Sequence, residues 1–139
     1  LLDAAYDRLN APVPDALFLG SDHEHRIAVD AVEGVPDLVI EVLSPSTRRD
    51  DLPGGAKWRV YERFGIPFYW IVDPRTRTVA CYTWREGRYE EPLLRRRGDV
   101  LENALFPGIT LPVDELFARV QQPERPLPAR HPFRVARQA

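Results

Sequence analysis

The stretch VPDLVIEVLSPST, residues 35–47, decides the fold because it sets two carboxylates into an otherwise aliphatic strand. Alternate residues of a strand share a face, so Asp37, Val39 and Glu41 point one way while the residues between them form a purely apolar face. The two acids lie roughly 13 Å apart at ~3.3 Å per residue, which is too far to hold one ion together. At least one of them therefore needs a different partner.

A second strand with an acid at its start is predicted upstream, where Pro14-Asp15 precedes the apolar run ALFL at residues 16–19. If this strand pairs with the one at 37–43, Asp15 lies beside Glu41, and two carboxylates on adjacent strands suit a hard divalent cation such as Mg²⁺. Lys57 begins a short helical pattern that could lean over the same sheet edge. Acids and a lysine around a metal suit phosphodiester hydrolysis, because the metal polarises the phosphate and lowers the pKa of the attacking water.

The order of these motifs resembles the putative restriction endonuclease family of the Uma type, within the PD-(D/E)xK nuclease superfamily. The resemblance extends from about residue 14 to about residue 117. It rests on several ordered motifs: Pro14-Asp15, residues 36–47, Lys57 with Tyr61, the stretch GIPFYWIVDP at 65–74, and a weaker echo in LFPG at 105–108.

The resemblance implies an α/β domain with a mixed, twisted sheet flanked by helices, which is the restriction-endonuclease-like core. It implies a Mg²⁺- or Mn²⁺-dependent endonuclease that hydrolyses DNA phosphodiester bonds. Asp15 and Glu41 would be the metal-binding catalytic acids. Lys57 would be the catalytic lysine, moved into the helix from the strand position two after the glutamate, where this chain has Leu43. Asp37 matches a frequent family position, and we expect it to support the metal ligands from behind or to shape the start of the strand.

Two departures from the family leave other functions open. The segment between Thr47 and Lys57 is longer than usual and contains Pro53-Gly54-Gly55, which would shift the lysine. The family normally has a helical segment and a strand at its N-terminus, and this sequence starts at Leu1 and contains no methionine, so we expect it to begin after them. The alternatives are a non-catalytic, decayed nuclease fold that binds DNA or a partner, and a metal-dependent hydrolase of another phosphoester.

The net charge of −2 and the pI of about 5.9 exclude a global basic field that would attract DNA, so any DNA contact must be local. Arg48 and Arg49 follow the acidic strand, and their planar guanidinium groups suit phosphate recognition. The run Arg95 to Arg97 is more typical of a solvated hairpin rim. DNA is the expected partner, with a homodimer as an option, because nucleases of this kind often dimerise to cut both strands.

Other motifs carry weaker signals. The single cysteine, Cys81, excludes an intramolecular disulfide and fits a reducing cytoplasm as a core thiol. No apolar run is long enough for a membrane span. Asp22-His23-Glu24-His25 favours a polar loop over a metal site, because its spacing is not that of a helix-borne H-E-x-x-H. Ser44 lacks a Gly-x-Ser-x-Gly elbow, which favours a capping turn over a nucleophile.

The expected organisation is one nuclease-like domain over residues 1–121 and a flexible tail, rich in proline and arginine, over 122–139. The strand at 68–73 is apolar on both faces, which predicts burial on both. Asp73-Pro74 then starts a turn rather than a catalytic site. The hydrophobic periodicity and the turn signals predict strands at 15–19, 37–43, 68–73, 77–84 and 88–94, a helix at 56–64, a short apolar stretch at 100–106 and a closing helix from Val113.

Overall fold

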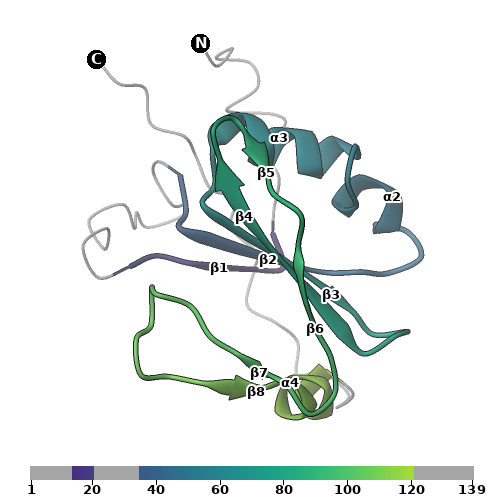
Figure 1. Ribbon diagram of the computed structural model, residues 1–139. Helices are drawn as coiled ribbons and strands as arrows, with labels where there is room; N and C mark the ends of the chain where they lie inside the picture. Colours follow the sequence, from purple (N-terminus) through teal and green to yellow (C-terminus); the bar gives the residue numbers. More distant parts are fainter. Residues whose placement is uncertain (1–13, 21–34, 121–139) are drawn as a thin grey trace, which may run out of the picture.

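The computed structural model describes residues 14–20 and 35–120, which form a mixed sheet with helices on both sides (Figure 1). Six strands make this sheet: β1 (Ala16–Phe18), β2 (Leu38–Val42), β3 (Phe68–Asp73), β4 (Thr78–Arg85), β5 (Arg88–Tyr89) and β6 (Leu93–Arg95). Their order is β1-β2-β3-β4-β5, and β6 also pairs with β4. Strands β2 and β3 are parallel, and the other pairs are antiparallel. The predicted α/β class is confirmed.

The parallel pair β2 and β3 requires a crossover, because parallel strands cannot be joined by a tight turn. Helices α2 (Arg48–Asp51) and α3 (Ala56–Phe64) supply it on one side of the sheet. Helix α3 has the predicted bounds and ends at Gly65, whose positive φ of 68° lets its N–H bond back to the carbonyl of Glu62. Helix α2 was not predicted, since four residues are too few to show a helical period.

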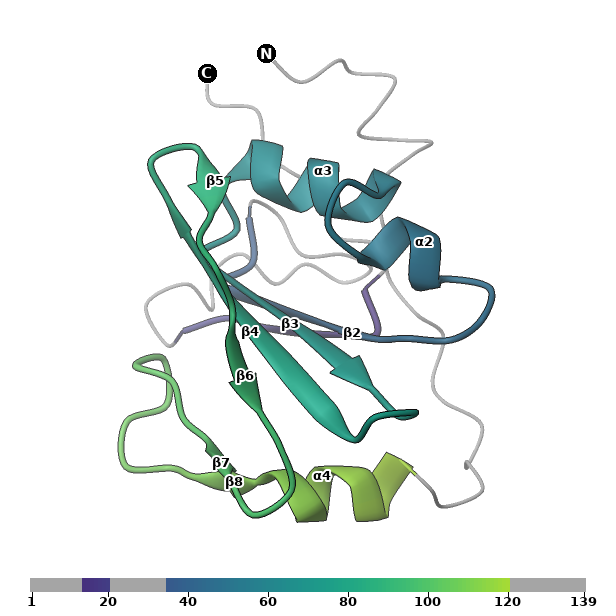
Figure 2. The ribbon, with the colours of Figure 1, turned by 45° about the vertical axis from the view of Figure 1, so that its right-hand side comes forward.

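Each face of the sheet has its own core, and Figure 2 shows helices on both sides of the sheet. Helices α2 and α3 cover one face, and α4 (Val113–Val120) covers the other together with the hairpin of β7 (Val100–Leu101) and β8 (Leu111–Pro112). The predicted alternation is confirmed, and five of the six residues of β3 are buried. The core under α3 includes Val39, Tyr61, Tyr69 and Ile71, and the core against α4 includes Leu38, Trp70, Val72 and Phe117.

An aromatic cluster joins α3 to the sheet. The Trp58 ring centroid lies 5.7 Å from that of Tyr69, 4.7 Å from that of Tyr82 and 5.0 Å from that of Tyr89. Such pairs add about 0.5–1.5 kcal/mol each beyond the area they bury. The hydroxyl of Tyr69 donates to the carbonyl of Asp51 at 2.7 Å, and that of Tyr89 donates to the carbonyl of Ile66 at 2.9 Å. The cluster therefore fixes both crossover helices over β3.

The second half of the domain follows the prediction less closely. The strand expected at 88–94 is divided into β5 and β6, and the interruption contains Pro92, which has no N–H for a ladder. Arg96 and Arg97 lie exposed beyond β6, as expected for a solvated rim, whereas Arg95 is half-buried at the end of β6. Cys81 is half-buried on β4 against the α4 core, and burial raises the pKa of its thiol to about 11.

Three predicted features lie outside the described residues: the segment before residue 14, the Asp22-His23-Glu24-His25 motif and the tail at 122–139. The division into a domain ending at 121 and a tail therefore stays a prediction. None of the helices within 14–20 and 35–120 combines the length and the apolarity that a membrane crossing requires.

The junction of α2 and α3 gives a test of this packing. A Cβ added at Gly55 would collide with the backbone carbonyl of Arg49. We expect Gly55→Ala to lower the free energy of unfolding by about 1–3 kcal/mol, as overpacking usually does. Gly54→Ala is the control, because a Cβ there meets nothing within 4 Å and only its φ of 84° is strained, at a cost of about 1 kcal/mol. Urea unfolding measures both, and a Gly55→Ala loss no greater than that of Gly54→Ala would contradict the tight junction.

Candidate active site

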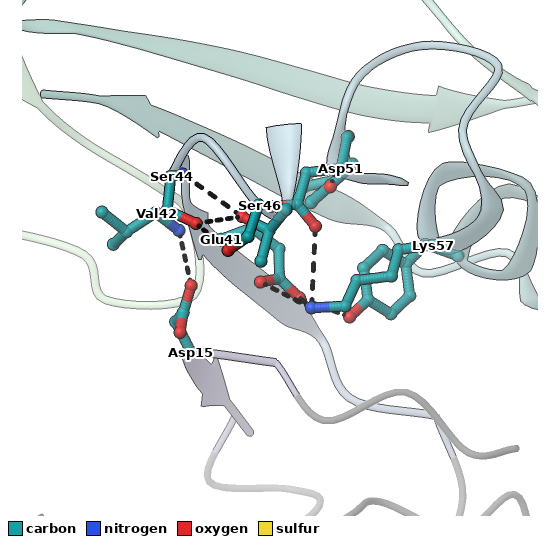
Figure 3. Close-up of polar contacts among 10 residues, drawn as sticks. Asp15, Glu41, Val42, Ser44, Ser46, Asp51 and Lys57 are labelled. Carbon is teal, nitrogen blue, oxygen red and sulfur yellow. Dashed lines mark hydrogen bonds and ion pairs between the residues drawn. The ribbon is translucent and has the colours of Figure 1, made fainter. Parts of the chain in front are cut away.

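The pairing of β1 with β2 brings the first two candidate residues together. The antiparallel register pairs Ala16 with Ile40, so Asp15 comes level with Glu41 on the neighbouring strand. The Asp15 carboxylate Oδ2 accepts the backbone N–H of Val42 at 2.8 Å (Figure 3). This bond orients an exposed carboxylate at the end of β1 beside the buried one on β2.

Glu41 is the centre of the site, and its residue is 0% exposed. It lies on the α3 face of β2, where Tyr61 and Lys57 of that helix both reach it. The Tyr61 hydroxyl donates to Glu41 Oε1 at 2.6 Å, and Lys57 Nζ lies 3.3 Å from Oε1 and 3.2 Å from Oε2. Residues four apart share one face of a helix, which is why one helix supplies both donors. The longer loop before α3 therefore does not remove Lys57 from Glu41.

Asp51 joins this group although the sequence interpretation missed it. It ends α2, is 0% exposed, and has its Oδ1 3.6 Å from Lys57 Nζ. Figure 3 shows the lysine nitrogen joined by dashed lines to Glu41 and to Asp51. Since α2 was not predicted, no periodicity indicated which of Asp50 and Asp51 points inward. Only the packing of α2 against α3 decides it.

The site places three acidic side chains around one ammonium group. Burial raises the pKa of Glu41 to about 7, although the Tyr61 hydrogen bond and the Lys57 charge oppose the shift. Asp51 and Asp15 push the Glu41 pKa in the same direction as burial. Burial also raises the pKa of Asp51, again against the Lys57 charge. Three carboxylates beside one ammonium favour a further cation.

Asp37 lies at the start of β2, away from Glu41. Its Oδ2 accepts the N–H of Gly20 at 2.7 Å, and its backbone N–H donates to the Phe18 carbonyl at 3.0 Å. It therefore joins the end of β1 to the start of β2. Of the two roles expected for Asp37, these contacts match the shaping of the strand start, which in turn sets the register that brings Asp15 level with Glu41.

The two candidate arginines differ in their surroundings. Arg48 Nη1 and Nη2 each lie 3.2 Å from Asp73 Oδ2, and this pair holds α2 to the end of β3. Asp73 also accepts the N–H of Arg75 at 3.0 Å, as expected for a turn. Arg49 is exposed on α2 and makes no ion pair with the described residues. Of the two, Arg49 is the one whose guanidinium remains available.

Ser44 lies in a turn that leads into α2. Its carbonyl accepts the N–H groups of Thr47 and Arg48 at 3.2 and 2.9 Å. Its hydroxyl lies 3.1 Å from that of Ser46 and 3.0 Å from that of Thr47. The described part of the chain contains no histidine that could activate a serine. The contacts are those of the turn that the sequence predicted.

The donor set suits a magnesium ion that keeps part of its water shell. Within residues 14–20 and 35–120, no three side chains of His, Cys, Asp or Glu converge into a metal-holding group. Mg²⁺ commonly takes only one or two carboxylates from a protein and completes its octahedron with water and substrate phosphate. Asp15 and Glu41, level on adjacent strands, fit that requirement.

The raised pKa of Glu41 predicts how stability varies with pH. Between its ordinary value of 4.5 and about 7, the folded protein keeps a proton that the unfolded chain releases. The stability contributed by this group is therefore full below pH 4.5 and is lost as the pH rises through 7. The loss amounts to about 3 kcal/mol, at 1.36 kcal/mol per pKa unit.

We therefore expect Glu41→Gln, which cannot ionise, to be more stable than the native protein at pH 8 in chelator-treated buffer. The difference should shrink towards pH 4.5. Urea unfolding across this range measures it, with Glu91→Gln as an exposed control. A gap that stays constant with pH would show that Glu41 titrates normally.

Comparisons with known proteins identify a family and a similar fold. A family model described as "putative restriction endonuclease" matches residues 3–114. A crystal structure of a putative nuclease belonging to DUF820, from Anabaena variabilis, matches with a TM-score of 0.50 and 21% identity, over 61% of this chain and 45% of that one. The present chain thus spans less than half of that protein, and the likeness shows a shared fold. No curated protein matches. Because the family model takes in most of the sequence, the chain belongs to the Uma2 family of putative restriction endonucleases.

Proposed function

We propose that this protein is a Mg²⁺-dependent endonuclease that hydrolyses DNA phosphodiester bonds. The observation that carries the proposal is the buried Glu41 carboxylate, level with Asp15 on the next strand and bonded to the Lys57 ammonium of α3. In a chain of this family, an acid pair beside a lysine supplies ligands for a metal and a positive charge for the reacting groups.

Each of the chain's own residues has a defined task in this proposal. Tyr61 holds Glu41 Oε1, and the Lys57 ammonium lies 3.2 Å from Oε2, the oxygen that a metal would take over from the lysine in this proposal. The Val42 N–H holds Asp15 in the same way. The Lys57 ammonium orients the attacking water or balances the charge of the phosphate. When bound, Mg²⁺ would supply charge neutralisation of the phosphate and acidification of water. The water oxygen attacks phosphorus in line, the bond to the 3′ oxygen breaks, and that oxygen takes up a proton.

The chain carries a net charge of −2, so its overall charge does not attract DNA. Individual arginines must therefore bind the phosphates that flank the reacting bond. Arg49 is exposed on α2, in the first part of the crossover that follows β2, so its guanidinium can pair with a phosphate. Arg48 would have to leave Asp73 to do the same. We therefore assign substrate binding mainly to Arg49.

One observation favours a non-catalytic nuclease fold as the second candidate. Both oxygens of Glu41 already have donors in Lys57 and Tyr61, an arrangement that a purely structural ion pair would also show. Such a module would bind DNA or a partner without cutting. Cleavage and metal-binding measurements separate the two candidates.

Plasmid cleavage is the direct test of catalysis. We expect the native chain to nick supercoiled plasmid with Mg²⁺ or Mn²⁺, and Lys57→Met to lower the rate by about 10²-fold or more, as loss of a positioned catalytic group does. Arg59→Met removes a charge from an exposed position on the same helix and should cut at the native rate. Equal rates in native and Lys57→Met proteins would exclude the lysine from the reaction. If the folded native protein does not nick the plasmid, the result would favour the non-catalytic module.

Metal affinity tests the acid pair separately. We expect Asp15→Asn to weaken Mn²⁺ binding by at least about tenfold, since an anionic ligand worth 1.4 kcal/mol or more is lost. Lys57→Met should bind Mn²⁺ as tightly as the native chain or more so, because a competing ammonium on Glu41 is removed. Calorimetry measures both, with Asp50→Asn as a control for the loss of an exposed acid on α2. Native affinity in Asp15→Asn would place the metal elsewhere.

A further inference from the structure

Asp51 has a buried carboxyl group, and its interactions with neighbouring side chains offset the cost of that burial only in part. Its residue is 0% exposed, and within the described residues no donor reaches Oδ1 or Oδ2 in good hydrogen-bond geometry. The side chains of Thr47 and Lys57 lower the pKa of Asp51, but burial has the larger effect and raises it. Its cationic neighbour is Lys57 Nζ, 3.6 Å from Oδ1. A buried carboxylate that its neighbours compensate only in part costs several kcal/mol, and an apolar residue of similar volume would avoid that cost. Stability alone therefore does not account for an aspartate here.

The backbone holds this carboxylate in a fixed place. The Asp51 carbonyl accepts the Tyr69 hydroxyl from β3 at 2.7 Å, and the Asp51 N–H donates to the Thr47 carbonyl at 3.1 Å. Gly55 lets the end of α2 lie directly against the start of α3, two residues before Lys57. The carboxylate is thus anchored to the sheet and to the helix that carries the lysine.

The lysine itself is unusual in this chain. Lys57 is the only lysine in the sequence, and every other basic side chain apart from the histidines is arginine. Lysine and arginine are not interchangeable, since the ammonium is a compact charge on a flexible stem. The Lys57 side chain is 25% exposed, so it has a path to solvent if its contacts in the site are lost. An ammonium group on such a flexible side chain stays at one position only if a neighbouring group holds it there.

Resting on the function proposed above, we propose that Asp51 is a positioning residue, whose carboxylate keeps the Lys57 ammonium at the site when a metal occupies Glu41. Without metal, Lys57 is held by Glu41 at 3.2 and 3.3 Å and by Asp51 at 3.6 Å. A divalent cation on Glu41 would take that acceptor and repel the ammonium. Asp51 would still hold the ammonium from the end of α2.

The single lysine allows a test that does not depend on cleavage. Acetic anhydride modifies free amines, and mass spectrometry reports the modification of Lys57 separately from that of the N-terminal amine. With saturating Mg²⁺, we expect Asp51→Asn to raise the Lys57 modification rate at least about fivefold over the native chain, as the loss of about one kcal/mol of restraint would. Without Mg²⁺ the increase should be smaller, because Glu41 still holds the ammonium. Asp50→Asn, an exposed neighbour on α2, should behave like the native chain.

Three results would overturn the inference. The first is a native modification rate in folded Asp51→Asn with Mg²⁺ bound. The second is a weaker Mg²⁺ affinity in this variant by calorimetry, which would make Asp51 a metal ligand. The third is an unchanged kcat for plasmid nicking, since displacement of the lysine should lower kcat with little change in KM. If Asp51→Asn does not fold, Asp51→Ser removes the same charge in a smaller side chain. A native chain that cuts no plasmid but shows the expected modification pattern would refute the endonuclease while leaving the role of Asp51 in place.

Discussion

A carboxylate buried in the middle of a β-sheet is the constraint on which the rest of this structure depends. Glu41 has no access to water, so its charge or its proton must be balanced by neighbours. Two donors from one helix, Tyr61 and Lys57, lie one turn apart and contact the carboxylate. The crossover that joins β2 to β3 therefore does more than connect parallel strands, because it brings these donors over the acid.

The two donors do not offset the full effect of burial on Glu41. Burial raises the pKa of Glu41 to about 7, and the nearby Asp51 and Asp15 add to the shift. Within the described residues, no donor reaches the Asp51 carboxylate in good hydrogen-bond geometry, and burial raises its pKa against the opposing effects of Lys57 and Thr47. A fold that needed only stability would place apolar residues at such positions. Carboxyl groups with raised pKa values cluster at functional sites more often than elsewhere, and the chain belongs to the Uma2 family of putative restriction endonucleases. These two observations support the proposed metal site.

The packing that creates the site is spread over elements far from it in sequence. The aromatic cluster around Trp58 packs α3 against the sheet. The Tyr69 hydroxyl donates to the carbonyl of Asp51, the last residue of α2. Asp37 holds β1 to β2 by its bond to Gly20, which sets the register that puts Asp15 level with Glu41. Arg48 and Asp73 join α2 to β3. Each of these contacts is modest, and together they determine which polar atoms meet.

The sequence by itself determined the elements with strong periodicity and the faces they bury. The alternation in β2 and β3 and the bounds of α3 were predictable because period 2, period 3.6 and a closing glycine are local signals. It also indicated Asp15, Glu41 and Lys57 as a group, through the order of motifs. Only the tertiary structure decided that Asp51 faces Lys57 and that Arg48 is engaged by Asp73. It likewise decided that the residues after Tyr89 leave the sheet before β6 begins. A four-residue helix and a broken edge strand have no period to read, and the direction of their side chains is set by packing against elements distant in the chain.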